Sequence, residues 1–188
     1  MTDLPSADWP GDIGPIFLTE DEIQRRVAEL GAEISRDYAG QDLILIGVLT
    51  GVFIFLADLM RAMTIPVTVD FLALSRYGPS EQTHGVVRLT KDLDVAIAGR
   101  HVLFVEDIID TGFTTRFIMH TLRLREPASC RVCTLLNRPR RRIIDIELDY
   151  VGFDMPDYYV VGYGLDHDER YRNLPYLVRF DPDQLKQD

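Results

Sequence analysis

The sequence has few cysteines, no long hydrophobic run and no excess of positive charge. Its 188 residues include two cysteines, and the formal net charge is −10. This acidic balance argues against a general binder of nucleic acid or of anionic membranes, because such proteins present a basic surface. We therefore expect neither nucleic acid nor a membrane as a partner.

The longest apolar stretch, residues 43–57, is shorter than the ~20 residues that a membrane-spanning helix needs. Gly47, Thr50 and Gly51 interrupt it, so it is better interpreted as a strand, a tight turn and a helix. Residues 1–15 are acidic and rich in Pro and Gly, which is not the pattern of a signal peptide. We expect a cytoplasmic protein with a loose N-terminal arm over residues 1–15.

The two cysteines form Cys130-Arg-Val-Cys133, a spacing that also occurs in redox pairs and in half of a zinc site. A zinc site needs two further ligands at matching spacing, and a redox pair should lie at a helix N-terminus. This pair lies in a strand pattern, residues 131–136, where residues three apart face opposite sides. We interpret both as ordinary core or near-core cysteines.

Hydrophobic periodicity predicts strands that alternate with helices. Thr19-Glu-Asp-Glu22 is a capping-box pattern, and apolar residues follow it at helical spacing. The alternation indicates a single α/β domain, residues 1–188, with an open, mainly parallel sheet that binds ligands at the carboxyl ends of its strands. The predicted helices span residues 19–38, 52–63 and 114–125, and the predicted strands span 43–49, 67–74, 86–89, 100–105 and 131–136, with shorter ones within 144–153, 158–163 and 176–180.

Residues 102–115 hold the densest motif of the chain. A buried strand should end at the adjacent carboxylates Glu106 and Asp107, and a loop of small and hydroxyl-bearing residues then opens onto a helix. The free N–H groups and the dipole of a helix N-terminus favour a phosphate. The carboxylates suit ribose hydroxyls, or a Mg²⁺ that bridges them to phosphate oxygens. An isolated acidic pair is usually a solvated strand end, but this combination favours a phosphorylated sugar.

Val105-Glu-Asp-Ile-Ile-Asp-Thr-Gly112 resembles the phosphoribosyl pyrophosphate (PRPP) motif of the hypoxanthine-guanine phosphoribosyltransferases. Glu106 distinguishes it from the pyrimidine-operon regulators of the same superfamily, which usually have Asp there. The resemblance extends over residues 17–180. It implies the type I phosphoribosyltransferase fold, with a small hood built from N- and C-terminal segments and a mobile lid loop.

The same resemblance implies purine salvage. Such an enzyme is a glycosyltransferase that transfers 5-phosphoribose from PRPP to hypoxanthine or guanine, giving IMP or GMP and pyrophosphate. It also implies Mg²⁺ as the cofactor and a homodimer or homotetramer as the assembly. In this reading Asp110 is the catalytic base, Glu106 and Asp107 bind the ribose and the metal, and the other PRPP-binding residues are Ile108, Ile109, Thr111, Gly112, Thr114 and Thr115.

Leu49-Thr50-Gly51 stands where the family has a Leu-Lys-Gly loop that grips pyrophosphate, often through a cis peptide. Thr50 removes one positive charge, although its hydroxyl and the backbone N–H groups can still donate. Arg172 matches the family's pyrophosphate-binding arginine. Arg76-Tyr77 lies where the family's lid carries Ser-Tyr, so Arg76 either supplies the missing charge or is a solvated loop arginine.

Arg138 takes the place of the family's lysine that contacts the 6-oxo group of the purine. Arginine also donates hydrogen bonds, but its planar fork needs more room. Arg140, Arg141 and Arg142 follow, and we expect these three on the surface because a run of charges is normally a solvated face.

The resemblance places three more residues around the base. Tyr159 would stack on the purine, the backbone of Val160 would bind the edge of the base, and Asp166 would lie near the purine and hold a second Mg²⁺. As an alternative, Tyr159 and Val160 are simply core residues of an edge strand.

The replacements at Thr50, Arg76 and Arg138 leave two other functions open. One is a regulator that senses PRPP or a nucleotide on the same fold without catalysis. The other is a phosphoribosyltransferase for another 6-oxopurine such as xanthine. Retention of Asp110 favours an enzyme, because a sensor need not keep a base.

Overall fold

The computed structural model describes residues 13–77 and 86–181, and strands alternate with helices through most of it. The helices are α1 (Glu20–Asp37), α2 (Phe53–Ala62) and α3 (Phe113–Arg123), with a 3₁₀ turn at Pro139–Arg141. The strands are β1 (Ile13–Leu18), β2 (Leu43–Leu49), β3 (Val67–Tyr77), β4 (Val86–Lys91), β5 (His101–Ile109), β6 (Ser129–Asn137), β7 (Tyr150–Asp154), β8 (Tyr159–Val161) and β9 (Leu177–Phe180).

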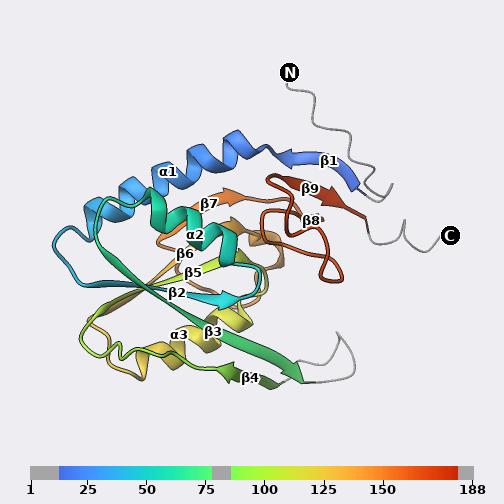
Figure 1. Ribbon diagram of the computed structural model, residues 1–188. Helices are drawn as coiled ribbons and strands as arrows, with labels where there is room; N and C mark the ends of the chain where they lie inside the picture. Colours follow the sequence, from blue (N-terminus) through green and yellow to red (C-terminus); the bar gives the residue numbers. More distant parts are fainter. Residues whose placement is uncertain (1–12, 78–85, 182–188) are drawn as a thin grey trace.

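Two sheets organise these elements (Figure 1). The larger sheet has the order β4-β3-β2-β5-β6-β7 and is parallel except for β4, which pairs antiparallel with β3. The smaller sheet, β1-β9-β8, is antiparallel and joins the N-terminal strand to the C-terminal one. It lies toward the end of the larger sheet to which the β2 and β7 arrows point in Figure 1. This is the predicted hood.

The core follows from the two-residue period of the central strands. On β5, Leu103 and Val105 belong to the cluster that includes α1 and α2, whereas Val102 and Phe104 belong to the cluster that includes α3. All four side chains are fully buried, as predicted for a strand covered on both faces. At about 1.5–3 kcal/mol for each large apolar side chain, their burial fixes the register of β5.

The predicted capping box starts α1. The Thr19 hydroxyl accepts from the Glu22 backbone N–H at 3.3 Å, and the Glu22 carboxylate accepts from the Thr19 N–H at 2.8 Å. Both bonds satisfy N–H groups that a helix start leaves free, so the sequence signal and the helix start agree.

Several predicted boundaries are wrong. β1 begins at Ile13, inside the expected loose arm, because it pairs with β9. β5 continues past Val105 through the acidic pair to Ile109, because β6 pairs with it along that length. The shorter strand expected within residues 144–153 is β7, which begins at Tyr150.

The segment around Arg76 and Tyr77, expected to be the mobile lid loop, is largely strand in the described residues. β3 extends to Tyr77 and pairs with β4, so much of this segment is a two-stranded arm. Residues 78–85, at its tip, lie outside the described residues.

Both cysteines are free thiols, and burial raises the pKa of Cys130 to about 11. The interpretation as core or near-core cysteines is confirmed, with Cys133 fully buried.

In the described part of the chain, none of the helices has the length and hydropathy needed to cross a membrane.

Candidate active site

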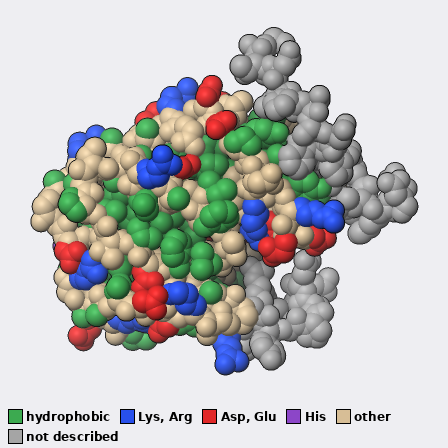
Figure 2. Space-filling view, in the orientation of Figure 1, with side chains coloured by type: hydrophobic (Ala, Val, Ile, Leu, Met, Phe, Trp, Pro, Cys, Tyr) green, Lys and Arg blue, Asp and Glu red, His purple; other side chains and the backbone are tan. Residues whose placement is uncertain are grey.

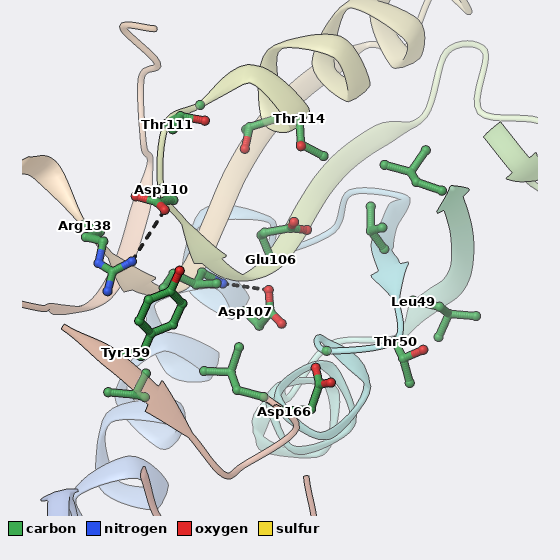
Figure 3. A pocket seen from close by; sticks show the side chains of 18 residues that line it. Leu49, Thr50, Glu106, Asp107, Asp110, Thr111, Thr114, Arg138, Tyr159 and Asp166 are labelled. Atoms are coloured by element: carbon green, nitrogen blue, oxygen red, sulfur yellow. Dashed lines mark hydrogen bonds and ion pairs between the residues drawn. The ribbon is translucent and has the colours of Figure 1, made fainter. Parts of the chain in front are cut away.

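A cavity of about 530 Å³ opens at the carboxyl ends of the parallel strands (Figure 3). Ligands bind at this edge in open α/β sheets. The lining comes from β2 and its following loop, from β3, from β5 and the start of α3, from the residue after β6, and from β8 with the loop that follows it. Its members are Val48, Leu49, Thr50, Gly51, Leu74, Glu106, Asp107, Ile108, Asp110, Thr111, Gly112, Thr114, Thr115, Arg138, Tyr159, Val160, Leu165 and Asp166.

The loop between β5 and α3 forms one wall. Gly112, the N-cap of α3, has a φ of 89°, a left-handed conformation that glycine adopts without strain. A Cβ at Gly112 would also lie 2.8 Å from the carbonyl oxygen of Ile144. The hydroxyl residues Thr111, Thr114 and Thr115 line the cavity beside this helix start. Hydroxyls, free N–H groups and a helix dipole together make an anion site.

Glu106 and Asp107 lie in the middle of the cavity (Figure 3). Burial, and then the neighbouring Asp107, raise the pKa of Glu106 well above its usual range. Burial raises the pKa of Asp107 to about 6, although the Ile108 N–H donates to Asp107 Oδ1 at 2.7 Å. Such carboxylates are stabilised by a cation or by hydroxyl donors that enter the cavity.

The loop after β2 forms the opposite wall, and its Leu49–Thr50 peptide bond is cis. A Cβ added to Gly51 would lie 1.7 Å from Asp107 Oδ2, and a Cβ added to Gly164 would lie 2.2 Å from the Gly51 carbonyl oxygen. The loop backbone therefore packs directly between the acidic pair and the hood, and a side chain at position 51 would have to displace Asp107.

Arg138 and Tyr159 form the remaining end of the cavity. Arg138 is 3% exposed, its Nη1 is 3.5 Å from Asp110 Oδ2, and its Nη2 donates to the carbonyl oxygen of Tyr158. Its guanidinium also lies over the Tyr159 ring, 5.7 Å from the centroid. Tyr159 is 54% exposed, which suits a stacking platform better than the alternative of a core residue. Val160 is buried beside it.

Three buried polar atoms of the cavity have no hydrogen-bond partner among the described residues. They are Glu106 Oε2, Asp110 Oδ1 and Arg138 Nε. Buried polar groups are nearly always hydrogen-bonded, because an unpaired one costs about 1–3 kcal/mol. All three residues line the cavity, although Arg138 Nε also lies 3.8 Å from Asp157 Oδ1. The two carboxylate oxygens without a partner therefore favour a polar ligand.

Arg142 is not the surface residue that the sequence predicted. Its guanidinium is half-buried and donates to the backbone carbonyl oxygens of Asp110 at 2.9 Å and Ile109 at 3.2 Å. The expectation failed because a run of three arginines gives no signal of which one turns inward. Arg140 is exposed, and Arg141 pairs with Asp157, as expected for a charged surface.

Some of the predicted site residues do not reach the cavity. Ile109 is 1% exposed and packs in the core on the α3 face. Arg172 does not line the cavity; it pairs with Asp166 and Glu169, each at 2.9 Å. Its pyrophosphate contact stays a prediction. The side chains of Arg76 and Tyr77 lie outside the described residues.

The predicted metal ligands Glu106, Asp107 and Asp166 all line the cavity. Within residues 13–77 and 86–181, however, no three carboxylate, His or Cys side chains converge into a metal-binding group. A metal here would need ligands from a substrate as well, which is how Mg²⁺ is usually held.

Sequence reasoning missed three apolar residues of the lining, Val48, Leu74 and Leu165. Each lies at or just beyond the end of a predicted strand, where an apolar side chain looks the same whether it faces core or ligand. Their position could have been inferred only from the rule that ligands bind at strand carboxyl ends.

Comparisons with known proteins agree with this geometry. The model of the phosphoribosyl transferase domain family matches residues 17–169. The chain is therefore a phosphoribosyltransferase, and its mixed α/β architecture with a mostly parallel sheet and a hood is the type I fold of that class.

The relatives narrow the class. The chain is 50% identical to the hypoxanthine-guanine phosphoribosyltransferase of Mycobacterium avium over 184 residues, which cover 95% of this chain and 91% of the relative. It is 45% identical to that of Bacillus subtilis over 166 residues, 88% of this chain and 92% of the relative. A solved hypoxanthine phosphoribosyltransferase from Staphylococcus aureus is 39% identical, with a TM-score of 0.91. The match covers 96% of this chain and 98% of the chain of that structure. The chain belongs to the hypoxanthine-guanine phosphoribosyltransferase family.

The packing of Gly51 gives a first prediction. Gly51→Ala should lower kcat/KM for PRPP by roughly 10²-fold, because the added methyl group displaces Asp107 or the loop, and misplacement by about 1 Å has that cost. Thr50→Ala, which removes atoms from the same loop, is the control and should cost far less. Steady-state kinetics with PRPP as the varied substrate measure both. A Gly51→Ala enzyme with the kinetics of the wild type would contradict the assigned packing.

Proposed function

We propose that this protein is a cytoplasmic purine-salvage enzyme that transfers 5-phosphoribose from PRPP to N9 of hypoxanthine or guanine. The products are IMP or GMP and pyrophosphate. The observation that carries the proposal is that Arg138, Asp110 and Glu106 line one cavity, with a buried oxygen on each of the two carboxylates that has no hydrogen-bond partner among the described residues. Their chemistry matches, in turn, a base oxygen, a base N–H and the hydroxyls of a ribose.

The purine base and the phosphate groups bind at different ends of the cavity. The purine stacks on Tyr159, with its 6-oxygen at Arg138 and its edge on the Val160 backbone. The 5′-phosphate lies in the loop at the start of α3, whose Thr hydroxyls and N–H groups donate to it. The pyrophosphate lies toward the Thr50-Gly51 loop, within reach of Arg172 if its present ion pairs open.

The reaction breaks the bond from ribose C1 to the pyrophosphate oxygen and forms the bond from C1 to N9. Positive charge builds up on the ribose as the leaving group departs. As N9 attacks, the proton on N7 passes to Asp110. Arg138 contacts Asp110 Oδ2 at 3.5 Å and leaves Oδ1 without a hydrogen-bond partner among the described residues, so the carboxylate keeps an oxygen that can accept the proton.

A regulator that only senses PRPP would use the phosphate loop and the acidic pair. It would have no need for a carboxylate at the base end of the cavity with one oxygen that has no hydrogen-bond partner among the described residues, which is what Asp110 provides. The Asp110–Arg138 pair therefore supports the enzyme over the sensor.

Mg²⁺ fits the residues present. Glu106 and Asp107 are adjacent carboxylates, Glu106 Oε2 is buried without a partner, and burial raises the pKa of both groups. Oxygen ligands from one or two carboxylates, completed by substrate oxygens, are what Mg²⁺ prefers. Glu106 and Asp107 would hold one ion, and Asp166 a second. When bound, Mg²⁺ would neutralise charge on the leaving pyrophosphate.

Removal of the metal tests this assignment. Among the described residues that line the cavity, Arg138 is the only cation, so the protein itself offers little positive charge to the pyrophosphate. EDTA should abolish turnover, and added Mg²⁺ should restore it. Turnover that continues at the same rate in EDTA would exclude the metal.

Asp110→Asn tests the base. The substitution keeps the shape of the side chain and removes the basic oxygen, so kcat should fall by about 10²–10⁴-fold. KM for PRPP should change little, because Asp110 lies at the base end of the cavity. An unchanged kcat would remove Asp110 from the role.

Release of pyrophosphate from PRPP with a panel of bases tests the function itself. Arg138 can only donate hydrogen bonds, so it pairs with a 6-oxo group and meets the 6-amino group of adenine donor to donor. Leaving such groups unpaired costs about 1–3 kcal/mol, and 1.4 kcal/mol is tenfold. Hypoxanthine or guanine should therefore be used at least about tenfold better than adenine, with xanthine as the remaining arm of the panel.

Two variants show whether Arg138 sets this preference. Arg138→Met should lower kcat with every base, because it also frees Asp110, but it should erase most of the ratio between hypoxanthine and adenine. Arg140→Met, at an exposed arginine, is the matched control and should keep the ratio. A preference of the wild type for adenine, or an Arg138→Met enzyme with the full ratio, would contradict the base assignment.

One face of α2 supports the proposed assembly. Phe53, Ala57 and Met60 recur at i, i+4 and i+7 and are exposed, opposite the buried side chains of the helix. Figure 2 shows hydrophobic side chains gathered over the face where α1 and α2 lie in Figure 1. We assign this stripe to contacts in a homodimer or homotetramer.

A double variant, Phe53→Glu with Met60→Glu, should yield monomers in sedimentation velocity. A wild-type protein that sediments as a monomer would contradict the assignment.

A further inference from the structure

Arg142 makes a set of contacts that the roles assigned above do not use. Its Nε donates to the Asp110 carbonyl oxygen at 2.9 Å, and its Nη2 donates to the Ile109 carbonyl oxygen at 3.2 Å and to Asn137 Oδ1 at 2.7 Å. One guanidinium thus links the end of β5 to the end of β6. Arginine suits this task because its planar fork carries several donors in fixed directions.

The next residues continue the same contact. The backbone N–H groups of Ile143 and Ile144 both donate to the Thr111 carbonyl oxygen, each at 3.0 Å. The carbonyl oxygens of Ile109, Asp110 and Thr111 are therefore all held by the segment that carries Arg142. Ile144 also lies against Gly112, where a Cβ would meet its carbonyl oxygen at 2.8 Å.

The direction of these carbonyl groups sets the direction of the N–H groups. In a planar trans peptide, the C=O of one residue and the N–H of the next point in opposite directions. With the Asp110 and Thr111 carbonyl oxygens turned toward residues 142–144, the N–H groups of Thr111 and Gly112 point the other way. Both residues line the cavity on that side.

We propose that Arg142 is a positioning residue for the phosphate site: it holds the carbonyl groups of the loop so that the Thr111 and Gly112 N–H groups face the 5′-phosphate. The inference rests on the proposed function, which places the phosphate in this loop. Arg142 does not line the cavity, so it acts on the phosphate without contacting it, through the backbone carbonyl groups that it holds.

The test compares a ligand that has the phosphate with one that lacks it. Calorimetry gives Kd for IMP and for inosine with the wild type, Arg142→Met, Arg142→Lys and Arg140→Met. The wild type should bind IMP far better than inosine. Arg142→Met should lower the ratio of Kd for inosine to Kd for IMP at least tenfold. Its Kd for inosine should stay within about threefold of the wild-type value. Arg140→Met, at an exposed position of the same run, should keep the ratio.

The lysine variant separates geometry from charge. Arg142→Lys retains the charge and most of the side chain but loses the planar set of donors of the guanidinium. Its ratio of Kd for inosine to Kd for IMP should therefore also fall far below the wild-type ratio. It also carries the test if the methionine variant does not fold. A ratio in Arg142→Met equal to that of the wild type, full retention of the ratio by Arg142→Lys, or equal weakening of IMP and inosine would each overturn the inference.

The failure of the proposed function would look different. A wild type that binds IMP and inosine alike would overturn the phosphate site itself, and the role of Arg142 with it. A wild type that prefers IMP, with an Arg142→Met variant that prefers it equally, would overturn only the role of Arg142.

Discussion

The parallel pairing of β5 with β2 on one side and β6 on the other is the constraint on which the rest of the structure depends. Gly47 pairs with Val105, and Glu106 pairs with Thr134, so the carboxyl ends of all three strands meet at one edge. β5 is buried on both faces up to Val105, which makes a slip of its register costly. This register places the acidic pair, the loop after β2 and Arg138 around one cavity.

The distribution of positive charge follows from what stands at that edge. The loop after β2 carries Thr50 in place of a lysine, and Arg138 stands at the base end of the cavity. Under the proposed function, recognition of phosphate would therefore depend on backbone N–H groups, hydroxyls and a metal more than on side-chain cations. In such a site the orientation of the backbone matters as much as the identity of the lining residues. This dependence on backbone orientation is the reason we assign Arg142, which lies behind the loop, a role in positioning the phosphate site.

Local signals in the sequence predicted much of the fold. The capping box at Thr19 and the apolar run of β5 each act within a few residues, and both are confirmed. What failed depended on partners distant in the chain. β1 begins early because β9 pairs with it, and β5 continues through two carboxylates because β6 does. The inward turn of Arg142 depends on carbonyl groups more than 30 residues away in sequence, which no local pattern reveals.

The candidate site shows the same division. The motif around Asp110 could be predicted because its residues are adjacent in sequence, whereas the apolar lining and the pairing of Arg172 with Asp166 required coordinates.

The most direct test of the proposed function is a crystal structure with IMP bound. We predict the hypoxanthine 6-oxygen within hydrogen-bond distance of the Arg138 guanidinium, N7 facing Asp110 Oδ1, and the 5′-phosphate at the N–H groups of Thr111 and Gly112. A base bound away from Arg138, or a phosphate outside that loop, would contradict it.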